Sequence, residues 1–197
     1  MADARRGFVP EDEHDFSSES LVCLKKASGN IRYLINEGYD LKQAATFVGN
    51  HFLLSERQRM AIVRSVATDE QVKDRAGKRI GNQKLQGETV WVDGFNTIIT
   101  LEVMLSRSPL FLCMDGAVRD LAALRGTYRL IPETEAAIKL LFDMLQSAGV
   151  KGIKILLDQP VSNSGRLKVL LAEVGVDYAF DLDVQILKDV DRKLWNK

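Results

Sequence analysis

The sequence has little of what several common classes of protein depend on. Its 197 residues include two cysteines, Cys23 and Cys113, which are too few and too far apart for a disulfide framework or a thiolate metal site. We therefore expect Cys23 and Cys113 to be buried free thiols in a reducing compartment. The two histidines, His14 and His51, do not have the spacing of metal ligands.

Long apolar segments are also missing. No apolar run approaches the roughly 20 residues that a membrane-spanning helix needs. Arg5 and Arg6 near the N-terminus are not followed by the apolar stretch of a secretory signal. These absences predict a cytoplasmic protein without a membrane partner.

Neither net charge nor a glycine-rich loop identifies a ligand. Acidic and basic residues number 27 each, and no GxGxxG, GxxxxGK[ST] or GxSxG motif occurs, which disfavours cofactor dehydrogenases, P-loop NTPases and serine hydrolases. The charge is uneven, however, with eight basic and four acidic residues in 52–87, against 13 basic and 15 acidic residues from Glu88 onward. A basic segment beside an acidic site suits a polyanion, although a solvated helix face explains the same surplus.

The first part of the chain has the pattern of a helical domain. Residues 1–17 are polar and predict a flexible lead-in, and residues 18–80 carry apolar residues at helical spacing. Three helix starts are marked by a capping residue with glutamine three positions later: Asp40 with Gln43, Ser55 with Gln58, and Thr68 with Gln71. The polar, glycine-bearing stretch 77–87 predicts a boundary.

Residues 88–197 have the pattern of an α/β domain. Short β-prone runs are expected as strands at Thr89–Val92, Leu110–Met114, Ile153–Leu157 and Tyr178–Leu182. Helical patterns separate or follow them at Thr97–Leu105, Ala117–Arg125, Pro132–Ala148 and Gly165–Val174. This alternation predicts a parallel sheet that is covered by helices on both faces.

Three consecutive strand candidates are each followed directly by an aspartate: Asp93, Asp115 and Asp158. The carboxyl ends of parallel strands lie at one edge of a sheet, where ligands bind, so we expect the three carboxylates to converge there. Close carboxylates repel one another unless a cation or a proton compensates, and oxygen ligands suit Mg²⁺ or Mn²⁺. The alternative for each aspartate is an ordinary helix cap.

Polar residues near these aspartates complete the expected site. Asn96 could orient a carboxylate or a water, or cap the following helix. Ser162, Ser164 and Arg166 open a helix after Asp158, which suits a substrate phosphate but also ordinary capping. Further candidates are Arg119, Arg125 and Arg129 for phosphate and Asp120 for the acidic site, although a solvent-exposed position is the favoured alternative for each.

The segment ETVWVDGFNTIITLEVML resembles the opening of PIN-like nuclease domains, particularly of the NYN branch. With LFLCMDGAVRDL and KILLDQPVSNSGRL, the whole chain resembles an uncharacterised, mainly archaeal family that has a helical N-terminal part and a PIN-like, Rossmannoid C-terminal part. The resemblance implies a Mg²⁺- or Mn²⁺-dependent ribonuclease site, in which Asp93 matches the first-strand ligand, Asp158 a later strand-end acid, and Asp115 a less direct match. The late Ser/Thr-x-Asp signature of PIN-like domains is absent. Either the last acid is Asp181 or Asp183, or the final strand is missing, or the site is degenerate.

Three hypotheses follow. The first is a metal-dependent ribonuclease that uses Asp93, Asp115 and Asp158. The second is a non-catalytic nucleic-acid-binding module with a degenerate site. Arg57, Arg59 and Arg64 would then lie on the second helix of a helix–turn–helix, although a plain helical bundle explains the same segment. The third is a phosphatase or nucleotide-binding enzyme with a small phosphorylated substrate. The sequence leaves the oligomeric state open, a homo-oligomer included.

Overall fold

The capping signals in the N-terminal half are confirmed. The computed structural model describes residues 5–122 and 126–195. The side chain of Asp40 accepts a hydrogen bond from the backbone of Gln43, and Ser55 and Thr68 form complete capping boxes with the glutamines that follow them. The helices are α1 (Asp12–Asp15), α2 (Ser18–Asn36), α3 (Leu41–His51), α4 (Glu56–Ser65) and α5 (Asp69–Lys78).

Two compact units divide the chain, and the division is not a single cut. The first unit comprises residues 1–79 together with 107–122, and the second comprises 80–106 together with 123–197. Apolar side chains from α2, α3 and α4 form the core of the first unit: Leu24, Ala27, Ile31, Ile35, Ala44, Ala45, Val48, Leu54, Ile62 and Val66. No helix within the described residues is long and apolar enough to cross a membrane.

The strand expected at Leu110–Met114 is not part of the parallel sheet. Instead β2 (Leu110–Leu112) pairs antiparallel with β3 (Val118–Asp120), and this hairpin belongs to the first unit. It is fixed there by the N–H of Met114, which donates to the carbonyl of Ser65 over 2.9 Å. The helix expected at Ala117–Arg125 is therefore also wrong where the structure describes it, and residues 123–125 lie outside the described part.

The lead-in predicted for residues 1–17 is structured from residue 5 onward. Asp12, in α1, is buried and pairs with Arg57 of α4, with N–O distances of 2.7 and 3.0 Å. Arg57 also donates to the carbonyl oxygen of Leu121 over 2.9 Å, so it ties α1, α4 and the end of the hairpin together. The polar composition predicted a flexible segment, because the sequence does not show that Arg57 is the partner of the buried Asp12.

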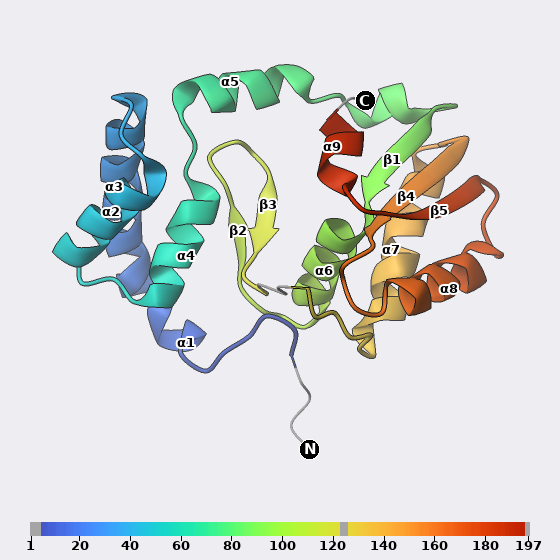
Figure 1. Cartoon of the computed structure of the whole chain (residues 1–197), viewed down its shortest axis with the longest axis horizontal. Helices are drawn as coiled ribbons and strands as arrows, with labels where there is room; N and C mark the ends of the chain where they lie inside the picture. The colour runs from blue at the N-terminus through green and yellow to red at the C-terminus, as the bar shows by residue number, and fades with distance from the viewer. Residues whose placement is uncertain (1–4, 123–125, 196–197) are drawn as a thin grey trace. The chain divides into compact units, whose positions relative to one another are not determined.

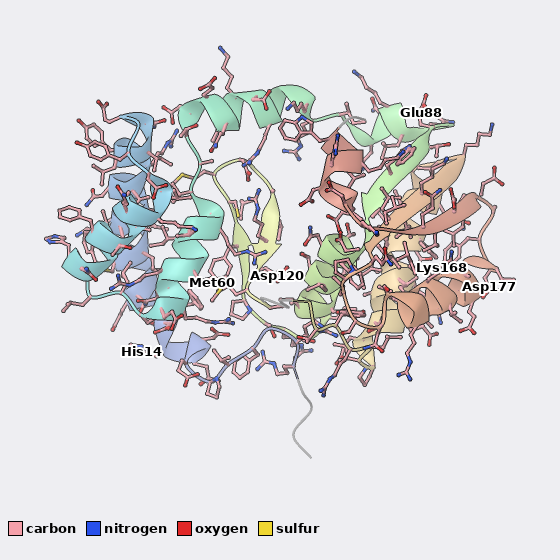
Figure 2. The ribbon with its side chains drawn as sticks, viewed as in Figure 1. His14, Met60, Glu88, Asp120, Lys168 and Asp177 are labelled. Atoms are coloured by element: carbon pink, nitrogen blue, oxygen red, sulfur yellow. The ribbon has the colours of Figure 1, made fainter. Side chains whose placement is uncertain are left out.

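The second unit contains the parallel sheet, in the order β1 (Thr89–Asp93), β4 (Gly152–Asp158), β5 (Asp181–Leu187) (Figure 1). A 3-10 helix (Asn82–Leu85) precedes it, and Glu88 lies just before β1 (Figure 2). The helices are α6 (Gly94–Leu105), α7 (Glu133–Ser147), α8 (Ser164–Gly175) and α9 (Val190–Trp195). Chain connections in this unit therefore run from strand to helix to parallel strand, as the sequence predicts.

Only one face of this sheet is covered by the longer helices. Val92, Ile155 and Val184 are neighbours in the strand register and join one core with side chains of α6, α7 and α8. The opposite face carries a row of Trp91, Lys154 and Asp183, and only the short helix α9 packs on it, against β1 and β4. The expectation of a sheet covered on both faces is thus met only in part, because α9 is short and the face on which it packs carries polar side chains as well as the buried Leu156.

Candidate acidic site at the carboxyl edge of the sheet

Asp93 and Asp158 are the last residues of two neighbouring parallel strands. Asp93 is the register partner of Leu156, and Asp158 lies two residues further along β4. Both side chains therefore point to the same face of the sheet. A strand spacing of about 4.8 Å and a rise of about 3.3 Å per residue put their Cα atoms roughly 8 Å apart. The structure thus brings together two of the three predicted strand-end aspartates.

Asn96 holds the carboxylate of Asp93 in a defined position. Its backbone N–H donates to Oδ1 of Asp93 over 3.0 Å, and its side-chain amide donates to Oδ2 over 2.7 Å. Asp93 is also the N-cap of α6, so the capping role and the orienting role considered for this segment coexist. The two hydrogen bonds from Asn96 leave the other lone pairs of the Asp93 carboxylate available to a ligand.

Gly94 allows α6 to start directly against β4. A Cβ atom at this position would lie 2.5 Å from Cδ2 of Leu157 and 2.7 Å from Cγ2 of Ile155. It would also lie 3.0 Å from the carbonyl oxygen of Leu156. Because only glycine fits there, the Asp-Gly pair fixes the carboxylate of Asp93 at the edge next to β4.

The carboxylates at this edge interact electrostatically. Burial raises the pKa of Asp93, the hydrogen bonds from Asn96 lower it, and the charge of Asp191 raises it. Burial likewise raises the pKa of Asp158, and the N–H of Val190 opposes that rise with a hydrogen bond. The charges that raise the pKa of Asp158 further are those of Asp93, Asp191 and Asp189.

Asp189 and Asp191 are the acids that the sequence reasoning missed. The fourth strand was expected at Tyr178–Leu182, but β5 spans Asp181–Leu187, which places Asp181 at the start of the strand and Asp183 within it. Asp183 instead lies 3.9 Å from Nζ of Lys154. Val184, Ile186 and Leu187 are apolar, and Asp189 and Asp191 follow closely, which was the signal that could have located the end of the strand.

Asp115 does not end a strand of the parallel sheet, contrary to prediction. It lies in the turn of the β2–β3 hairpin of the first unit, where Arg119 binds it through two hydrogen bonds of 2.9 and 2.7 Å. Arg75 of α5 binds it as well. Asp120 closes β3 (Figure 2), is buried, and accepts a hydrogen bond of 2.8 Å from the N–H of Ala122. Both acids thus belong to the first unit.

The predicted phosphate-binding residues divide into two groups. Ser162 exchanges hydrogen bonds of 2.9 and 3.0 Å with the backbone of Tyr128, and Asn163 donates to the same carbonyl, so these two side chains hold a loop. Ser164 and Arg166 lie in the first turn of α8, and Arg166 is exposed.

The additional arginine candidates are divided between the two units. Arg119 lies in the first unit with Asp115. Arg129 is exposed in the second unit, and Arg125 lies outside the described residues.

Most arginines of the proposed helix–turn–helix are used internally. Arg57 is bound by Asp12, as described above, and Arg59 donates to the carbonyl of Leu54 and to Oδ1 of Asn50, each over 2.9 Å. Of the three, only Arg64 makes no side-chain hydrogen bond or ion pair to another described residue. A plain bundle therefore describes α3 and α4 better than a nucleic-acid reader.

The residues of the edge fit a divalent cation chemically, although they do not form a closed cage. Within residues 5–122 and 126–195, no group of three or more His, Cys, Asp or Glu side chains is arranged to hold a metal ion. Mg²⁺ is commonly held by one or two carboxylates, water and substrate phosphate, rather than by a cage made only of protein. Asp93 and Asp158 meet that requirement, and a cation would relieve their mutual repulsion.

Comparison with known proteins places the chain in a family. A family model described as a domain of unknown function, DUF5616, matches residues 82–197, and a second, DUF434, matches residues 23–78. The chain belongs to the DUF5616 family. The expectation of an uncharacterised family with two parts is confirmed, and the boundary between the two DUF matches falls near residue 80.

A relative of this DUF5616 chain comes from an archaeon. It is similar to the uncharacterized protein MJ0935 of Methanocaldococcus jannaschii, with 33% identity over 176 residues that cover 89% of this chain and 84% of the relative. No solved structure matches the chain significantly. The comparisons thus establish the family and leave the activity to be inferred from the residues.

Proposed function

We propose that the second unit is a metal-dependent ribonuclease of the PIN/NYN type, which hydrolyses RNA at the carboxyl edge of its sheet. The observation that supports this most is that Asp93 and Asp158 end neighbouring strands at the same edge of the sheet. Burial and nearby acids raise the pKa values of both side chains. Groups with perturbed pKa values that share one edge are typical of functional sites. Asp189 and Asp191 supply late acids in place of the missing Ser/Thr-x-Asp signature.

The side chains of this edge have separable roles in the proposed reaction. Asp93 and Asp158 would hold Mg²⁺ or Mn²⁺, which when bound polarises a phosphoryl oxygen and lowers the pKa of water. Asn96 keeps the carboxylate of Asp93 aimed at the site. An oxygen of Asp158 that does not contact the cation would orient the attacking water.

The start of α8 is the candidate contact for substrate phosphate. The helix has twelve residues, and no side chain caps its first backbone N–H groups, which remain available to an anion. Arg166, exposed in the first turn, adds a positive charge. This region follows Asp158 along the chain by a short loop, so phosphate and cation sites would adjoin.

Cleavage of single-stranded RNA in the presence of Mn²⁺ tests the proposal. Asn is as good an N-cap as Asp, so Asp93→Asn removes the charge while preserving the start of α6. We expect the variant to lose at least about 100-fold in rate. Asp181→Asn is the matched control, because Asp181 is exposed at the opposite end of β5. Equal rates for all three proteins would show that a different site, or a contaminant, cleaves the RNA.

RNA binding without cleavage is the second candidate function. It is favoured by the lack of a preformed group of three metal-binding side chains among the described residues. Retention of RNA by the wild-type protein, with no product at any Mn²⁺ concentration, would select it. Release of phosphate from nucleotides, with intact RNA, would instead select a phosphatase that uses the same acids.

A further inference from the structure

Three arginines line a hollow in the first unit that none of the functions above uses. The hollow has a volume of about 580 Å³ and lies where α5 meets the turn of the β2–β3 hairpin. Its charged lining residues are Arg75, Arg79, Arg119 and Asp115, and the remaining ones are Val72, Ala76, Met114, Gly116 and Ala117. All of them belong to the first unit, so the hollow is complete within one body.

Asp115 holds two of the three guanidinium groups in place. Its side chain is only 1% exposed and accepts two hydrogen bonds from Arg119, one from Arg75 and one of 3.1 Å from the N–H of Ala117. The arginines keep accessible edges, since the side chains of Arg75 and Arg119 are 47% and 29% exposed. A guanidinium has five N–H donors, so donors remain after the carboxylate is bound.

Arg79 brings a third positive charge that is not neutralised. It is exposed, and its side chain makes no hydrogen bond or ion pair among residues 5–122 and 126–195. A Cβ added at Gly116 would lie 4.0 Å from Nη1 of Arg79, which places this guanidinium beside the hairpin turn. With three arginines against one aspartate, the charged lining has a net charge of +2.

Acidic residues around α5 do not cancel this charge. Asp74 is paired with Lys78 at 2.7 Å, and Asp69 is paired with Arg32 at 2.6 Å. Neither acid lines the hollow. A concave surface with an excess of one sign of charge concentrates counter-ions, and arginine forks match the oxygens of phosphate.

We propose that this arginine hollow is a phosphate-binding site that takes a phosphate group of an RNA strand. Its volume exceeds that of a lone phosphate and lies within the range of small-molecule sites, so a nucleotide fits with its phosphate against the arginines. Asp115 is a positioning residue that keeps Arg75 and Arg119 aimed into the hollow. The site does not depend on the ribonuclease proposed for the second unit, since it lies within the first.

Binding of short labelled RNA to the full chain, measured by fluorescence anisotropy, tests the site. EDTA in the buffer prevents cleavage, so binding is measured whether or not the second unit is a nuclease. Arg79→Gln removes an exposed, unpaired charge and should weaken binding at least about tenfold without changing the melting temperature. Lys73→Gln is the matched control, because Lys73 is an exposed residue of α5 outside the lining and should bind within about twofold of wild type.

Two forms of the RNA and free phosphate distinguish the sources of the phosphate. Tighter binding of a 5′-phosphorylated strand than of a 5′-hydroxyl strand supports a site for the terminal phosphate, whereas equal binding supports an internal phosphodiester. Competition by millimolar inorganic phosphate supports the site in either case. Absence of RNA binding by the wild type, or equal losses in Arg79→Gln and Lys73→Gln, would overturn the proposal.

Discussion

Replacement of Gly94 by alanine tests whether the acidic edge depends on close contact between α6 and β4. The new methyl group would lie 2.5 Å from Cδ2 of Leu157 and 3.0 Å from the carbonyl oxygen of Leu156. Both leucines are fully buried in β4, so neither can give way without moving the strand. Overpacking of this kind costs about 1–3 kcal/mol.

A gain in helix propensity offsets part of that cost. Alanine is favoured over glycine by about 1 kcal/mol in the interior of a helix, and by less at Gly94, which is the first residue of α6. The clash involves a backbone oxygen, so we place its cost near the upper end of the range. We therefore expect Gly94→Ala to lower the free energy of unfolding of the second unit by about 2 kcal/mol.

Urea unfolding followed by tryptophan fluorescence measures this change selectively. Both tryptophans, Trp91 and Trp195, belong to the second unit, so their emission reports on that unit. Gly165→Ala in α8 is the matched control, because a Cβ there meets nothing within 4 Å. The control should be neutral or more stable by up to about 1 kcal/mol. If Gly94→Ala were as stable as the control, the close packing of the Asp-Gly turn against β4 would be refuted.

Two further predictions concern charge. Because the pKa of Asp158 is raised in the folded state, its contribution to stability is fully present below the ordinary value of 3.8 and is lost as the pH rises through the folded value. Asp158→Asn should therefore raise the urea midpoint, measured by tryptophan fluorescence, at about pH 7 and leave it unchanged at about pH 3. An unchanged midpoint at both pH values would contradict the claim that the charge of Asp158 destabilises the folded protein. The lowered pKa of Asp115, caused chiefly by its hydrogen bonds with Arg119, has the opposite sign, because that stability is present above 3.8 and is lost as the pH falls through the folded value. Asp115→Asn should therefore destabilise the first unit by about 1–3 kcal/mol at about pH 7, measured by circular dichroism, while the tryptophan transition stays in place.

Local signals in the sequence predicted the two strand ends that form the acidic edge. Val90–Val92 and Ile153–Leu157 are β-prone runs, and each leads directly to an aspartate. Both strands pair in parallel and are followed by helices, so the general rule for ligand sites at carboxyl edges placed Asp93 and Asp158 together. Helix starts were equally well predicted, because capping depends only on neighbouring residues.

Pairing partners that a β-prone run does not itself specify explain the errors. Leu110–Met114 is as β-prone as the true sheet strands, but its partner is Val118–Asp120, which folds back on it, and the resulting hairpin joins the first unit. Nothing within the run itself specifies this partner, so Asp115 was assigned to the wrong unit. In β5 the alternation of Asp181 and Asp183 with Leu182 and Val184 was a readable sign of a strand with one polar face.

The central claim is that Asp93 and Asp158 share one divalent cation at the carboxyl edge of the sheet. Anomalous diffraction from crystals soaked in Mn²⁺ measures this directly. We predict a peak between the two carboxylates in the wild type and its disappearance in Asp158→Asn. Well-ordered Asp93 and Asp158 side chains with no peak between them at saturating Mn²⁺ would contradict the claim.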